Sequence, residues 1–329
     1  MKLHIKPNNE VSLKWSMMRT LILCWVLPLT LLTIIVLNFV YRNLNQQTEQ
    51  AIINSTEKAV EISLSRMQDS ITASKNASYL PTIRERYNQF LLDQNKRQLY
   101  DTITRFLSQQ YRFDDRFLST MLMFTDDPQN VYYTYSNKYM STYSNVQYFK
   151  RHVLAQVMEI SKELDTKVRF IPFDSRVYMV RNLMTPNFEP YAVIVMELNN
   201  ESVFESIGTI WGYEEGTIYK NGSFLWGSDN NEYLSRYDTI TDRSIYYKNS
   251  NGSYVYKTLK FNQDVLTFVA KLNNDVILYE MDALRYIVIL SIPLLFAFVL
   301  IVFRFFHRKI TKPIFHLISA AHKISDGNY

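Results

Sequence analysis

Two stretches without a charged residue constrain this chain more than any other feature of its sequence. Residues 20–41 form an uncharged run of 22 residues, and residues 286–303 form another of 18. An α-helix rises 1.5 Å per residue, so each run is long enough to cross the ~30 Å hydrocarbon core of a bilayer, the second with little to spare. The sequence therefore predicts transmembrane helices at 20–41 and 286–306, with residues 42–285 between them.

The distribution of charge predicts the orientation of these spans. The net charge is +5, of which residues 1–19 carry +3 and residues 304–329 carry +4, which leaves −2 for the rest. Basic residues gather on the cytoplasmic side of membrane helices, so we expect both termini in the cytoplasm and residues 42–285 outside the cell membrane. The first span is long for a cleaved signal peptide and lacks a small-x-small site before Arg42, which favours an anchor. The basic ends report topology, so they do not indicate nucleic-acid binding.

The outer segment must be held together by its own core. The only cysteine, Cys24, lies within the first span, so no disulfide can form outside. A segment of this length is sufficient for one long domain or for two smaller modules. We expect two modules, at 42–198 and 199–285.

Two helical patterns open the outer segment. No proline or glycine occurs from Asn43 to Ser74, and one apolar stripe runs along this stretch: Ile53, Val60, Leu64, Met67 and Ile71. The stripe packs either on its own module or on a second copy of the chain in a parallel homodimer. A second helical pattern covers 83–110, with Leu92, Leu99, Ile103 and Phe106 on one face.

Alternating apolar residues then predict strands that pair in antiparallel sheets. The first module has a helix at 149–164 and strands at 118–124, 131–135, 168–173, 177–184 and 191–198. The second has a short helix at 201–210 and strands at 216–219, 224–226, 244–248, 254–261 and 266–272. Asn221-Gly222 and Asn251-Gly252 are typical of two-residue hairpin turns. The fold class is therefore α+β, with a long N-terminal helix.

This layout resembles the double Cache sensor domain, a pair of PAS-like modules. The resemblance rests on the stretches Val177–Leu198 and Gly216–Ser228. It implies a pocket for a small molecule in the membrane-distal module. The candidate residues are Tyr133, Tyr135, Tyr143, Asp174, Arg176, Tyr178 and Arg181.

Aromatic faces and a few charges suit a small polar ligand, although tyrosines on strands also serve plain packing. Arg181 is the strongest candidate, because it interrupts an apolar run and a charge there needs a partner. The amino-acid-binding members of the family have a tryptophan in this region, whereas none lies between Trp25 and Trp211 here. An amino-acid ligand is therefore in doubt.

The stretch after the second span resembles the first helix of a HAMP linker. Its matching residues, which we expect to relay the signal, are Pro313, Ile314, Leu317, Ala321, Ile324 and Gly327. Proline suits the first turn of a helix and glycine its end. Residues 307–329 cover only the first half of that module. An ordinary basic helix beside the membrane is the alternative.

With both segments taken together, the chain resembles the sensory half of YesM-like two-component histidine kinases. Such a kinase implies a carbohydrate-related ligand or a solute-binding protein outside, a homodimer, and a cytoplasmic response regulator. A chemotaxis receptor and a diguanylate cyclase share the same front end and remain alternatives. An adhesive scaffold is disfavoured, because it has no need of a HAMP-like joint.

The sequence contains no recognisable catalytic or metal-binding pattern. It has seven glycines, and none of its segments resembles a glycine-rich ATP lid or a zinc site. We therefore expect no catalytic residue, metal or cofactor in this chain. If the parent protein is a kinase, the region that binds ATP and Mg²⁺ lies beyond Tyr329.

Overall fold

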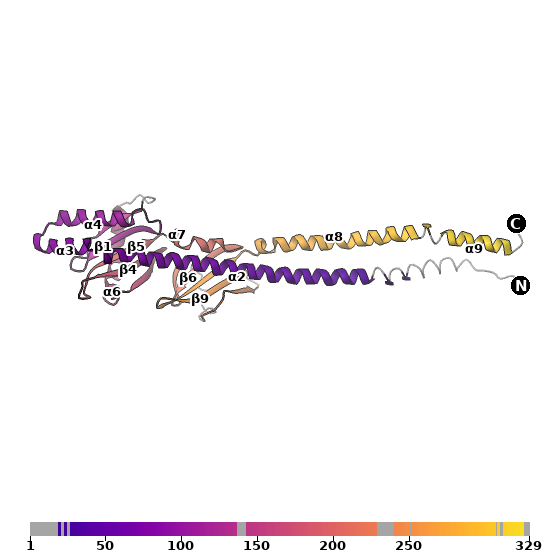
Figure 1. Ribbon diagram of the computed structural model, residues 1–329, viewed down its shortest axis with the longest axis horizontal. Helices are drawn as coiled ribbons and strands as arrows, with labels where there is room; N and C mark the ends of the chain where they lie inside the picture. Colours follow the sequence, from indigo (N-terminus) through magenta and orange to yellow (C-terminus); the bar gives the residue numbers. More distant parts are fainter. Residues whose placement is uncertain are drawn as a thin grey trace. The chain divides into compact units, whose positions relative to one another are not determined.

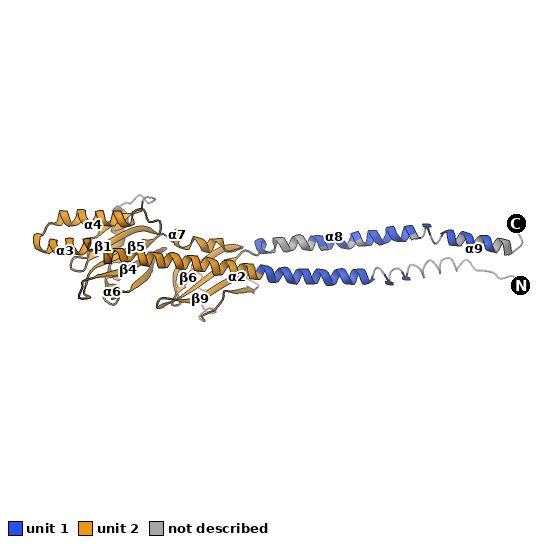
Figure 2. Cartoon of the chain, in the orientation of Figure 1, with its two compact units in different colours: residues 1–48, 275–329 blue, residues 49–274 orange. Residues whose placement is uncertain are grey.

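A computed structural model describes residues 19–20, 23–24, 27–136, 143–228, 240–249, 252–306, 308–309 and 312–325. The chain divides into two compact units (Figure 2). One comprises residues 49–274, and the other comprises residues 1–48 and 275–329. The unit 49–274 contains all the strands that the structure describes (Figure 1).

Helices introduce this unit. Helix α2 (Leu27–Tyr79) is followed by α3 (Thr82–Asp93) and α4 (Lys96–Tyr111). The single helix expected over 83–110 is wrong, because Gln94 adopts a left-handed conformation with φ of 53° and Asn95 caps α4, its side chain accepting from Gln98 N at 3.1 Å. The break separates Leu92 from the buried face of α4, and Leu92 is 89% exposed.

The first sheet contains β1 (Phe117–Phe124), β2 (Tyr132–Tyr135), β3 (Val168–Phe173), β4 (Arg176–Met184) and β5 (Pro190–Leu198). Its strands are antiparallel in the order β2-β1-β5-β4-β3. Between β2 and β3 the chain forms α5 (Tyr143–Tyr148), a π-helical segment η2 (Phe149–Val153) and α6 (Leu154–Ser161). The expected helix 149–164 therefore begins earlier and ends sooner.

The second sheet repeats this order. After α7 (Asn200–Phe204) and a 3₁₀ turn η3 (Glu205–Thr209) come β6 (Tyr213–Lys220), β7 (Ser223–Gly227), β8 (Ile245–Asn249), β9 (Gly252–Phe261) and β10 (Asp264–Leu272). Their antiparallel order is β7-β6-β10-β9-β8. Asn221 and Gly222 have φ of 50° and 76°, as the hairpin predicted. In the predicted Asn251-Gly252 turn, Asn251 lies outside the described residues, whereas Gly252 is not a turn residue as expected, because it begins β9 opposite Asn249. The antiparallel α+β fold with a long leading helix is thus confirmed.

Both faces of the first sheet are covered. One face packs on α5, η2 and α6, in a core that includes Met121, Met123, Phe149, Val153, Val157, Tyr178, Val180, Val193 and Val195. On the other face, the Tyr87 ring of α3 stacks on Phe124 at 4.2 Å, and the hydroxyl groups of Ser108 and Thr134 lie 3.0 Å apart. Every strand of this sheet therefore contributes side chains to two separate interiors.

Helix α2 packs on its own unit. Val60, Met67 and Ile71 are buried as expected, whereas Ile53 and Leu64 lie at the margin. The centre of the buried face is made of small residues, namely Thr56, Ala59, Ser63, Ser70, Ser74 and Ala77. Small side chains let the helix approach closely, and Ser63 Oγ lies 2.8 Å from Ser206 Oγ. The chain itself covers this stripe, which favours the packing alternative over a dimer seam.

The other unit is helical wherever the structure describes it. The helix that begins at Leu27 is long and apolar enough to cross a membrane, and its apolar window is not buried. Helix α8 (Asn274–Phe306) contains Pro293 and the second predicted span, with a shorter apolar stretch of 17 residues at Ile289–Phe305. Helix α9 (Lys312–Ser325) follows and has Pro313 in its first turn. Two spans and a HAMP joint remain predictions.

Candidate functional site

Two charged residues meet where β4 begins and β5 ends. Arg176 Nη1 lies 3.3 Å from Glu197 Oε1, and the Glu197 side chain is only 9% exposed. On the other flank of β5, Ser119 of β1 donates its hydroxyl to Glu197 Oε2 at 2.8 Å. The sheet registers Ser119↔Glu197 and Tyr178↔Glu197 explain this geometry, because paired residues of neighbouring strands point to the same face. Each carboxylate oxygen thus has a partner.

An aromatic ring holds Arg176 from the side of the helical layer. The Arg176 guanidinium lies 4.8 Å from the centre of the Tyr148 ring, a cation–π contact. The Tyr148 hydroxyl donates to the carboxylate of Asp174, and this hydrogen bond is the main cause that raises the pKa of Tyr148. Asp174 occupies the turn between β3 and β4 with φ of 52°. The arginine is therefore positioned by contacts from two other elements, β5 and α5.

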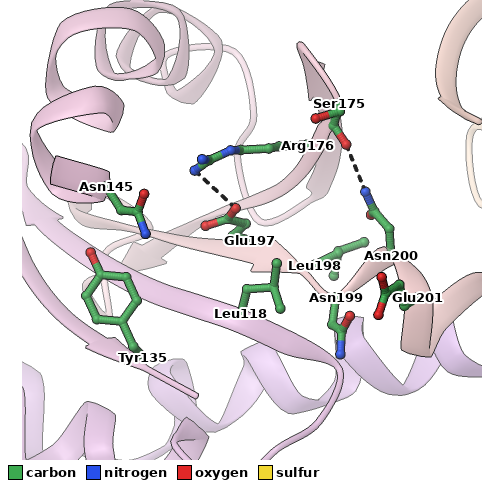
Figure 3. A pocket seen from close by; sticks show the side chains of 10 residues that line it. All are labelled: Leu118, Tyr135, Asn145, Ser175, Arg176, Glu197, Leu198, Asn199, Asn200 and Glu201. Atoms are coloured by element: carbon green, nitrogen blue, oxygen red, sulfur yellow. Dashed lines mark hydrogen bonds and ion pairs between the residues drawn. The ribbon is translucent and has the colours of Figure 1, made fainter. Parts of the chain in front are cut away.

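A cavity of about 360 Å³ opens beside this ion pair (Figure 3). Its lining residues are Leu118, Tyr135, Asn145, Ser175, Arg176, Glu197, Leu198, Asn199, Asn200 and Glu201. They come from the starts of β1 and β4, the ends of β2 and β5, α5 and the start of α7. Asn200 Nδ2 donates to Ser175 O at 3.1 Å, which joins α7 to the β3–β4 turn.

The electrostatics of the cavity are nearly balanced. Burial raises the pKa of the Glu197 carboxyl, and the Ser119 hydrogen bond and the Arg176 charge oppose that shift only in part. Burial lowers the pKa of Arg176, but Glu197 and neighbouring tyrosines reverse this, and the pKa of Arg176 is raised overall. With Glu201 added, the lining carries a formal charge of −1. Such a site suits a small ligand with several polar groups and no negative charge.

The structure brings several of the predicted residues together. Arg176 and Tyr135 line the cavity, and Arg176 donates a hydrogen bond to Tyr178, which is 1% exposed within the core. The Tyr133 ring packs edge-on against that of Tyr135, with centroids 5.3 Å apart. Tyr143 begins α5, and nothing is described of its side chain.

Arg181 is the exception among the predicted residues. It lies five positions after Arg176 on β4, so its side chain is on the opposite face of the sheet and lines a different cavity. The two candidate arginines therefore cannot share one ligand site.

Sequence reasoning missed the acid at the centre of the site. Glu197 ends an otherwise apolar strand, and the rule that singled out Arg181, a charge inside an apolar run, applies equally to it. The cavity amides Asn145, Asn199 and Asn200 carried no such signal, because asparagine is common in turns and helix caps. Asn199, for example, also caps α7.

The relay residues of the sequence lie on helix α9 where they are described. Pro313 and Ala321 are exposed, as are Ile314 and Leu317, at 43% and 70%. Ile324 belongs to the same helix, whereas Gly327 lies outside the described residues. Their role is untested and stays a prediction. Among the described residues, no group of three His, Cys, Asp or Glu side chains could hold a metal ion.

Comparison with known proteins gives matches in structure. No known protein family and no curated protein matches the sequence. The periplasmic sensory domain of the Campylobacter jejuni chemoreceptor Tlp1 has a TM-score of 0.50 at 10% identity, over 71% of this chain and 98% of that domain. The extracellular domain of the proposed histidine kinase vpHK1S-Z8 has a TM-score of 0.46 at 11% identity, over 71% and 98%. The ligand-binding domain of Mlp24 with asparagine has 0.45 at 12%, over 73% and 99%. By the Tlp1 match, the chain has the fold of a chemoreceptor sensory domain.

Proposed function

We propose that residues 49–274 are the extracytoplasmic ligand-binding domain of a bacterial membrane receptor. The observation that carries this proposal is the half-buried Arg176–Glu197 pair beside an open cavity, in a unit with the fold of a sensory domain. The two membrane spans are residues 20–41, which include the start of α2, and residues 286–306 of α8; both termini are cytoplasmic, and residues 42–285 lie outside. The helix from Leu27 supports the first span by length and composition.

The ligand is a small, uncharged molecule with several hydroxyl or amide groups. Arg176 and Glu197 already neutralise one another, so an uncharged ligand leaves that ion pair intact. The cavity amides Asn145, Asn199 and Asn200 can donate and accept, which matches vicinal hydroxyl groups. A carbohydrate-related molecule, free or presented by a solute-binding protein, fits this chemistry best. The titrations below include amino acids, because Mlp24 was solved with asparagine.

A binding experiment tests the site directly. The full chain in lipid nanodiscs is titrated with neutral sugars, amino acids and organic acids, and binding is followed by calorimetry and thermal unfolding. We expect Arg176→Ala and Glu197→Gln each to weaken the best neutral ligand by ~10-fold or more, the usual effect of losing a charge-assisted hydrogen bond. Arg181→Ala is the matched control, being the same residue type on the same strand. Unchanged affinity in Arg176→Ala contradicts the site.

Topology and output require a separate test. A reporter fused after Asn45 should behave as exported and one after Lys312 as cytoplasmic, and the reverse pattern contradicts a two-span receptor. For the output we propose a YesM-like histidine kinase, acting as a homodimer on a response regulator through a HAMP joint at Pro313–Gly327. ATP and Mg²⁺ then bind outside this chain. The chemotaxis receptor is the second candidate, favoured by the Tlp1 match. Ligand-dependent autophosphorylation of the full receptor distinguishes the two.

A further inference from the structure

A second cavity lies where the first sheet meets the second. Its volume is about 510 Å³, and it is bounded by α2, the connection from α6 to β3, strands β3 and β4, and the turn between β9 and β10. Its charged lining residues are Lys75, Glu163, Lys167, Arg169, Arg181 and Asp264. A contact between the sheets lies close by, since Lys220 Nζ of β6 donates to Phe170 O of β3 at 2.8 Å. Both sheets therefore contribute to this site.

The positive charges of this cavity are compensated only in part, because its four cationic and two acidic side chains give a formal charge of +2. Asp264 is already engaged, because it accepts from Asn221 Nδ2 at 2.7 Å and pairs with Lys220 Nζ at 3.5 Å. Glu163 is exposed to solvent. Within the described part of the chain, no carboxylate lies within ion-pair distance of Lys75 or Arg181. The Arg176 cavity has the opposite balance, with a formal charge of −1.

Arg181 is the most informative of these residues. It is half-buried on β4, and its one hydrogen bond within the described part of the chain runs from Nε to Ser78 Oγ of α2 at 3.3 Å. A guanidinium has five N–H donors, so most of its donors remain available to a ligand. Burial lowers the pKa of Arg181, which means that the cation is held at a free-energy cost.

We propose that this cavity binds a small anion carrying carboxylate or phosphate groups, held by Arg181 and Lys75 and attracted by the exposed Lys167. The anion supplies the negative partner that the protein does not. Because the β9–β10 turn also lines the cavity, the bound anion links the two sheets. This site goes beyond the proposed function, since it lies on the other face of β4 and binds an anion, not an uncharged ligand.

The experiment uses the full chain in nanodiscs, titrated with citrate, with inorganic phosphate and with glucose as the neutral probe. We expect saturable binding of citrate or phosphate with a raised Tm, and none of glucose at this site. Lys75→Ala and Arg181→Ala should each weaken the anion by ~10-fold or more, with Arg181→Lys weakening it less because the charge is retained. A preference for citrate assigns a carboxylate ligand, and a preference for phosphate assigns a phosphate ligand.

Two controls separate a built site from general attraction. Lys58→Ala removes an exposed lysine from the same helix as Lys75, and Arg176→Ala removes the arginine of the other cavity. Both should leave the anion affinity within about twofold, a difference that is small on the scale of one hydrogen bond. The proposal is overturned if neither anion binds, if Lys75→Ala and Arg181→Ala bind as the wild type does, or if Lys58→Ala weakens binding equally. The two proposals can fail separately, because the neutral-ligand site is tested by Arg176→Ala and the anion site by Lys75→Ala and Arg181→Ala.

Discussion

Arg176 and Arg181 lie on the same strand, but on opposite faces of the sheet and with different partners. Arg176 has a carboxylate at 3.3 Å and an aromatic ring at 4.8 Å, whereas Arg181 has a serine hydroxyl at 3.3 Å. Burial lowers the pKa of both side chains, but Glu197 more than offsets this at Arg176 and only distant tyrosines oppose it at Arg181. The strand and the residue type are the same, so the partner alone makes the difference.

This difference shows that a buried charge indicates a ligand in two distinct ways. A paired charge gives a polar but balanced wall, which selects uncharged ligands through hydrogen bonds. An unpaired charge gives a wall that is incomplete without an ion, which selects ligands by charge. The following predictions test whether pairing really separates the two arginines.

The largest effect should come from removing the carboxylate. Glu197→Ala leaves Arg176 without its ion-pair partner and Ser119 without its acceptor, so the free energy of unfolding should fall by ~2–3 kcal/mol. Urea unfolding followed by tryptophan fluorescence, to which Trp226 contributes with its ring 4.9 Å from that of Phe204, measures this. Glu205→Ala is the control, because Glu205 is 72% exposed and its contact with Arg66 is 3.7 Å long. Equal losses in both variants would mean that the buried pair has no special weight.

An effect of opposite sign is expected at the second arginine. Without any anion in the buffer, Arg181→Met should raise the free energy of unfolding by about 1 kcal/mol, because it removes a half-buried cation and keeps the side-chain volume. Arg176→Met, by contrast, should lower it. The same urea titration compares them. A loss at Arg181→Met as large as that at Arg176→Met would refute the distinction between the two sites.

The smallest effect should appear in the pH dependence. The pKa of Glu197 is raised by burial, so the part of its contribution that depends on protonation is full below the ordinary value of 4.5 and is lost as the pH rises through the raised value. Glu57 behaves in the reverse way, because Lys257 and Ser244 hold its pKa below 4.5 despite burial. Its contribution is present above 4.5 and lost as the pH falls. Urea unfolding of Glu197→Gln and Glu57→Gln against pH should therefore differ from the wild type in opposite directions.

Much of the fold could be predicted because its signals are local. Alternation along β4 and β5 and the Asn221-Gly222 turn are determined by residues close in sequence. The break at Asn95 was missed, because neither proline nor glycine marks it and a single capping side chain ends the pattern. The small residues of α2 were overlooked for another reason: Ser63 and Ser70 are buried by close approach, not by their hydrophobicity.

The site was harder to predict, because it depends on which face of a strand each residue occupies. Arg176 and Arg181 were predicted to belong to one site. Both faces of the first sheet are covered, and the sequence of β4 does not show which layer packs against each residue. Glu197 became recognisable only through its neighbours on β1 and β4. One of them, Ser119, is 78 positions away in the sequence. Long-range register is the information that a single sequence lacks.

The strand order also determines when each sheet can fold. In both sheets the first strand pairs with the last: Phe117 lies opposite Leu198, and Tyr213 lies opposite Leu272. The centre of a sheet therefore cannot close until its fifth strand has been synthesised, and such distant pairings are slow to form. Until both sheets have closed, the buried face of α2 lacks part of the surface on which it packs.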